Sequence, residues 1–116
     1  MFDFEKLDLY QVAKEQNLQV LKYIYTNKEI DEYIKDQWKR ATLSIILNLA
    51  EGTGRMTNAD KKHFLTISRS SVFESVAILD TIKGLNQIDE KLFKEFYDNY
   101  ETISKMLLGM FRSYNN

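Results

Sequence analysis

Residues 40–55 read Arg-Ala-Thr-Leu-Ser-Ile-Ile-Leu-Asn-Leu-Ala-Glu-Gly-Thr-Gly-Arg, an apolar segment that runs into a glycine-containing turn. The apolar side chains recur at three- and four-residue steps, which is the period of an α-helix. Gly52 suits the left-handed position that ends a helix, and Gly54 suits a tight turn after it. We therefore predict an apolar helix that ends at this pair of glycines and carries two polar side chains, Asn48 and Glu51, in its last turns.

Three further segments share this helical period. The four predicted helices cover residues 4–25, 29–51, 58–83 and 90–114, and Thr57 and Asp89 are the expected N-caps of the last two. Helices of this length span roughly 33–40 Å at 1.5 Å per residue. Because short polar loops join them, we expect an all-α, antiparallel up-down-up-down four-helix bundle, folded as a single domain over residues 1–116.

Composition limits the compartment in which the protein works. The 116 residues include no cysteine, so disulfides and thiol chemistry are excluded and a reducing cytoplasm is the expected location. No apolar stretch approaches the ~20 residues that a membrane span needs. The N-terminus, Met-Phe-Asp-Phe-Glu-Lys, lacks the basic start and apolar run of a secretory signal. We expect a cytoplasmic protein without a membrane association.

Charge is unevenly distributed along the chain. The net charge is −1, but residues 35–70 hold seven Lys/Arg and three acidic residues, whereas residues 1–34 hold four Lys and seven acidic residues. Phosphate binding requires several cations on one surface. The candidate nucleic-acid-binding residues are Lys39, Arg40, Arg55, Lys61, Lys62 and Arg69. The alternative is that these are ordinary solvated charges.

Catalytic patterns are weak in this sequence. A single histidine, His63, excludes a site that needs two imidazoles from one chain, and Asp60-Lys-Lys-His63 only approaches the Glu-x-x-His spacing of di-iron bundles. Gly52-Thr-Gly54 lacks the lysine and the spacing of a phosphate-binding loop. We expect no enzyme activity, no metal and no cofactor.

Two pairs of polar residues stand out within the apolar helices. Asn48 and Glu51 lie three residues apart on the second helix, and Ser71 and Glu74 repeat this spacing on the third. If both pairs point inward, they form a buried hydrogen-bond network that fixes the register of the two helices. Acid–base chemistry by the paired carboxylates is the alternative, and we favour the structural role.

The apolar content exceeds what one small bundle can bury. The second helix is apolar on most sides, and Phe93, Tyr97 and Phe111 flank the core positions of the fourth. Oligomerisation is the simplest explanation. The alternative is a groove that binds a membrane or another protein.

The motif of residues 41–55 closely resembles the signature of four-helix-bundle proteins encoded in intervening sequences of bacterial 23S rRNA genes. Further resemblance lies in Phe4-Glu-Lys-Leu7, in Ser71-Val-Phe-Glu74 and in the segment 107–112, Leu-Leu-Gly-Met-Phe-Arg. The resemblance implies a four-helix bundle that assembles as a ring-shaped homopentamer. It also extends to the accessory variability determinants of diversity-generating retroelements, which are basic proteins that bind nucleic acid and a reverse transcriptase.

The chain departs from this family pattern in two respects. Ile46 stands where the family commonly has proline, and the net charge is slightly negative where the retroelement proteins are strongly basic. Our first hypothesis is a non-enzymatic homo-oligomer that acts as an accessory factor for RNA, a ribonucleoprotein or a nucleic-acid-processing protein. The alternatives are a protein-interaction scaffold that does not bind nucleic acid and a metal-dependent enzyme.

Overall fold

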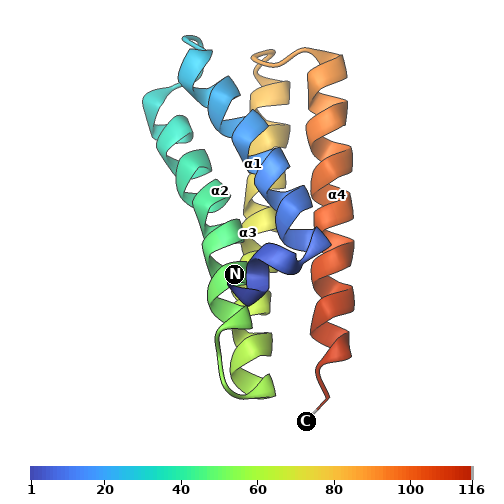
Figure 1. Ribbon diagram of the computed structural model, residues 1–116. Helices are drawn as coiled ribbons and strands as arrows, with labels where there is room; N and C mark the ends of the chain where they lie inside the picture. Colours follow the sequence, from blue (N-terminus) through green and yellow to red (C-terminus); the bar gives the residue numbers. More distant parts are fainter. Residues whose placement is uncertain (116) are drawn as a thin grey trace.

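The computed structural model describes residues 1–115, and the four predicted helices form an antiparallel bundle of 45 × 21 × 21 Å (Figure 1). Its elements are the 3-10 helix η1 (Asp3–Lys6) and the helices α1 (Asp8–Thr26), α2 (Glu32–Thr53), α3 (Asn58–Gly84) and α4 (Glu90–Ser113). Each helix packs against the one before it, and α4 packs against α1. The predicted all-α, up-down-up-down architecture is confirmed.

Side-chain caps explain where three helices begin. Thr57 Oγ1 accepts a hydrogen bond from the N–H of Asp60, and the Asp89 carboxylate accepts one from Leu92, so both predicted caps are confirmed. The second helix begins three residues later than predicted. Its cap is Asp31, whose carboxylate accepts from the backbone of Tyr33 and of residue 34.

The glycines at the end of α2 act differently from the prediction. Gly52 has helical backbone geometry inside α2, and no glycine among residues 1–115 has a positive φ, so the left-handed position predicted for Gly52 is wrong. Gly52 is buried, and a Cβ added there would lie 3.1 Å from the Cβ of Phe64 on α3. Gly54 follows as the C-cap with φ −87°. Gly52 therefore allows α2 and α3 to pack closely. This close packing explains why glycine occupies the position although its backbone is not strained.

The core is built from apolar side chains of all four helices. Trp38 of α2 lies at its centre, fully buried, and its ring contacts those of Tyr23 and Phe96 edge to face at 6.2 and 6.3 Å. The other large side chains that are fully buried in the core include Ile24, Ile45, Leu49, Leu65, Leu79, Ile82, Ile103 and Leu107. Burial of this kind contributes about 25 cal/mol per Å² of apolar surface and drives the helices together.

A layer of buried polar groups crosses this core. Trp38 Nε1 donates a hydrogen bond to Tyr100 Oη at 3.1 Å, and Asn17 Nδ2 donates to the carbonyl of Thr42 at 2.8 Å. Burial raises the pKa of Tyr100 to about 12, because the phenolate would lose its hydration. Gln16 Nε2 donates to a main-chain carbonyl of α4, at 2.9 Å. These bonds join α1 to α2, α1 to α4 and α2 to α4, and they disfavour packing in which one helix is shifted along another.

Candidate nucleic-acid interface

The predicted polar network between α2 and α3 exists in a smaller form. Asn48 Nδ2 donates to both the carbonyl and the Oγ of Ser44, at 2.9 and 3.0 Å, and Ser71 Oγ donates to Ser44 Oγ at 2.7 Å. Glu51 and Glu74 are exposed and stand outside it, so the prediction is wrong for both carboxylates. Side chains three residues apart on a helix point about 60° away from each other around its axis. Glu51 therefore points away from Asn48, and Glu74 away from Ser71, so both carboxylates lie in water, where an ionised group is stable.

Arg55 and Lys61 lie together where α2 turns into α3. The guanidinium of Arg55 lies 4.3 Å above the ring of Phe64 and 3.9 Å from the Glu51 carboxylate. Lys61 Nζ donates to the carbonyl of Thr53 at 3.2 Å, in the last turn of α2. The ion pair is exposed and therefore contributes little stability, so Arg55 remains available to an outside anion.

The C-terminal end of α4 adds aromatic and basic groups to this region. Lys62 lies 4.6 Å above the ring of Phe111, and Lys61 lies 5.8 Å from the ring of Tyr114. Arg112 is exposed in the last turn of α4. We name this region the loop-end surface and define it as Arg55, Lys61, Lys62 and Arg112 together with Phe64, Phe111 and Tyr114.

The loop-end surface is electropositive although the whole chain is not. It holds four cations, and residues 51–60, from the end of α2 to the start of α3, contribute two acidic residues, Glu51 and Asp60. The N-terminus of α3 points the same way, and the positive end of its dipole also favours anions. Three of these cations were identified from the sequence, but Arg112 and the rings of Phe111 and Tyr114 were missed, because their proximity depends on the packing of α4 against α3.

The other three predicted cations lie elsewhere. Lys39 is near α1, with its Nζ 5.6 Å from the ring of Tyr25. Arg40 is exposed on α2, thirteen residues before its end and hence roughly 20 Å along the bundle. Arg69 donates from Nε to the carbonyl of Ser104 at 3.2 Å, between α3 and α4. The six predicted residues therefore do not form one patch.

A separate apolar area lies on the outer side of α2. Leu43 and Leu47, one turn apart, are 47% and 56% exposed. Together with the half-buried Ala50, they form an apolar stripe that is partly exposed to solvent. An exposed apolar stripe of this kind is a candidate contact surface for another molecule.

Two negative observations apply to residues 1–115. No group of three or more His, Asp or Glu side chains is placed to hold a metal ion. None of the helices is long and apolar enough to cross a membrane.

These features define a small all-α bundle protein with a basic end and exposed apolar surface. The chain belongs to the family described as 23S rRNA-intervening sequence protein, whose sequence profile matches residues 5–109. It is also similar to the crystal structure of a protein of unknown function from the S23 ribosomal protein family of Bacteroides thetaiotaomicron. That similarity has a TM-score of 0.84 at 17% identity, covers 89% of this chain and 97% of the other, and establishes the shared fold. Among curated proteins none matches this chain.

Proposed function

We propose that the protein is a non-enzymatic, homo-oligomeric accessory factor of the cytoplasm that associates with RNA or a ribonucleoprotein through its loop-end surface. The observation that carries this proposal is the group of cations over aromatic rings, with Arg55 at 4.3 Å from Phe64 and Lys62 at 4.6 Å from Phe111. The description of the family, which refers to 23S rRNA, agrees with an RNA ligand.

The chemistry of the loop-end surface suits a nucleic-acid backbone. Lysine and arginine neutralise phosphates, and aromatic rings beside them offer stacking faces to unpaired bases. Three phosphate contacts give a salt slope of about −2 for single-stranded RNA, which is a weak interaction for one copy. Several copies in one assembly add their contacts, so oligomerisation raises the affinity of a chain whose net charge is only −1.

The exposed leucines of α2 support self-association. Burying Leu43 and Leu47 against another copy would contribute about 1–2 kcal/mol each. The family resemblance supports a ring of five copies. Sedimentation equilibrium measures the mass, and Leu43→Lys with Leu47→Lys should shift it towards the monomer.

The test of RNA association is a triple charge reversal at the loop-end surface. Arg55→Glu, Lys61→Glu and Lys62→Glu together should weaken binding to a labelled 23S rRNA fragment at least about tenfold at low salt, measured by fluorescence anisotropy. The matched control reverses Lys22, Lys28 and Lys91, which are exposed at the opposite end of the bundle. Circular dichroism and oligomer mass report whether each variant keeps its fold. Equal losses in both variants, or no RNA retention by the unmodified protein, would refute the proposal.

A further inference from the structure

The outer face between α3 and α4 contains two adjoining hollows, of about 380 and 350 Å³. The first lies nearer the loop-end surface and is lined by Leu107, Leu108 and Phe111 of α4. The second lies further along the bundle, where Val76 of α3 and Tyr97 of α4 form its walls. Together they form one groove, which we call the α3–α4 groove.

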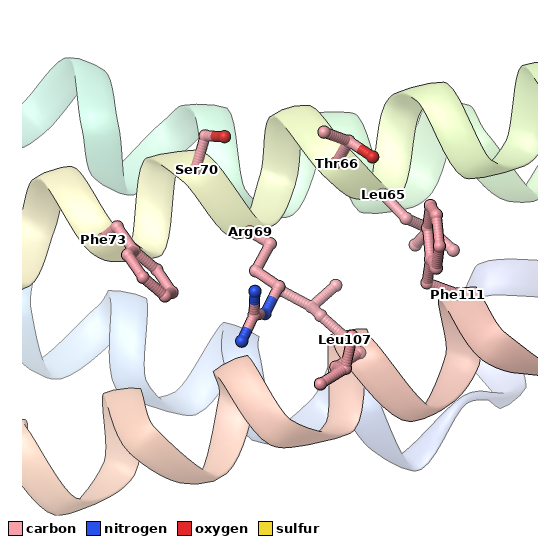
Figure 2. Close-up of a pocket in the computed structure, with 8 residues that line it drawn as sticks. Leu65, Thr66, Arg69, Ser70, Phe73, Leu107 and Phe111 are labelled. Atoms are coloured by element: carbon pink, nitrogen blue, oxygen red, sulfur yellow. The ribbon is translucent and has the colours of Figure 1, made fainter.

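Arg69 lines both hollows, and Figure 2 shows its side chain among the residues that line the first. Its Nε donates to the Ser104 carbonyl at 3.2 Å, and its guanidinium lies 4.9 Å from the ring of Phe73. Among residues 1–115 no carboxylate forms an ion pair with it. A half-buried guanidinium that is held in place and forms no ion pair within residues 1–115 can bind a carboxylate, with hydrogen bonds stronger than those between neutral groups.

The walls of the α3–α4 groove are apolar and its charge is positive. Phe73 and Tyr97 are 57% and 41% exposed, so both leave aromatic surface open to a ligand of the groove. Arg69 and Lys105 line the second hollow together with a single acidic residue, Glu101. The groove therefore complements a ligand that is apolar and carries a negative charge.

We propose that the α3–α4 groove binds an amphipathic helix of a partner protein, which presents one carboxylate to Arg69 between two apolar side chains that fill the hollows. The linings of the hollows are offset by about four residues along α3 and about seven along α4, or roughly 6–11 Å at 1.5 Å per residue. Apolar anchors at positions i and i+7 of the incoming helix, with glutamate at i+3 or i+4, match this offset. The proposal is independent of RNA binding at the loop-end surface.

A pair of synthetic helical peptides tests this proposal. One carries leucine at i and i+7 with glutamate at i+4, and its twin has glutamine in place of glutamate. We expect the glutamate peptide to bind about tenfold more tightly in fluorescence anisotropy at physiological salt, since a charge-assisted bond is worth more than a neutral one. Arg69→Gln should abolish this preference, and Phe73→Ala should weaken both peptides. Arg40→Gln, an exposed change on α2, is the control and should alter neither.

Several outcomes would overturn the proposal. Equal binding of the two peptides would do so, as would a preference that persists in Arg69→Gln with native helicity. If Arg69→Gln fails to fold, Lys105→Gln replaces it and should reduce the preference about twofold to threefold. Dissociation of the oligomer by Phe73→Ala would assign the groove to a second copy of the chain. Loss of RNA binding by the same variant, with the loop-end surface intact, would assign it to RNA.

Discussion

Replacing Gly52 by alanine tests the packing that places the loop-end surface. Gly52 lies in the last turn of α2 with helical backbone geometry, so alanine there lowers the conformational entropy of the unfolded chain and favours the helix by about 0.5–1 kcal/mol. The new Cβ, however, would lie 3.1 Å from the Cβ of Phe64 and 3.5 Å from the carbonyl oxygen of Lys61. Both belong to α3, and the Cβ of Phe64 is fixed to its backbone, so the two helices must separate by a few tenths of an ångström.

The free-energy cost of separating α2 from α3 decides whether Gly52→Ala stabilises or destabilises the protein. Overpacking a tight contact costs about 1–3 kcal/mol, which exceeds the gain from helix propensity. We expect Gly52→Ala to destabilise the protein by about 1 kcal/mol and to lower its Tm by about 4 °C. Gly109→Ala is the matched control, because Gly109 lies in α4, is exposed, and has no atom within 4 Å of an added Cβ. It should stabilise by about 0.5–1 kcal/mol and raise the Tm.

Thermal unfolding followed by circular dichroism at matched protein concentrations measures both variants, since the Tm of an oligomer depends on concentration. Opposite signs for Gly52→Ala and Gly109→Ala confirm the close contact of α2 with α3. A rise in Tm for both variants would refute it, because the helices would then have room for the methyl group.

Three further substitutions probe the core and the caps. In an alkaline denaturation series, the free energy of unfolding should fall by about 2 kcal/mol as the pH rises from 10 to 12. Burial raises the pKa of Tyr100 from 10.0 to about 12, so folding favours the neutral phenol, and this contribution is present below pH 10 and is lost as the pH rises towards 12. Tyr100→Phe should remove most of this dependence and cost about 1–3 kcal/mol at neutral pH, because Trp38 Nε1 loses its acceptor. Ser68→Ala should cost about 1 kcal/mol in urea unfolding, since its buried Oγ donates to the Ile45 carbonyl at 2.6 Å. Asp31→Ala should cost about 1 kcal/mol in the same assay by removing the cap of α2, and an unchanged midpoint would contradict that role.

Local signals in the sequence predicted most of the helix boundaries. Thr57 and Asp89 were identified as caps because a cap acts over three residues of the same chain, which the sequence displays directly. Asp31 was not predicted as the cap of α2, because the helical period of the sequence begins before it. In the structure, Asn27 Oδ1 accepts hydrogen bonds from two backbone N–H groups, and the chain turns at Asn27 before α2 begins. Periodicity identifies a helix more reliably than it identifies the first residue of that helix.

The candidate sites were only partly predictable. Sequence reasoning named the cations but could not separate Arg69 from Lys61 and Lys62, which are close in sequence. The structure places Arg69 in the α3–α4 groove, by a hydrogen bond to Ser104, thirty-five residues away. The position of a residue along its helix, together with its contacts to a neighbouring helix, determines on which surface of the protein its side chain lies.

By itself, the sequence determined four amphipathic helices, their short connections and the family to which the chain belongs, because helical period, capping and motif spacing are properties of neighbouring residues. Only the tertiary structure decided that Gly52 is a packing residue, that Glu51 and Glu74 face water, and that cations of α3 lie over aromatic rings of α4. Such outcomes depend on pairs such as Trp38 and Tyr100, sixty-two positions apart, which meet only when the apolar faces of the helices close on one another and expel water.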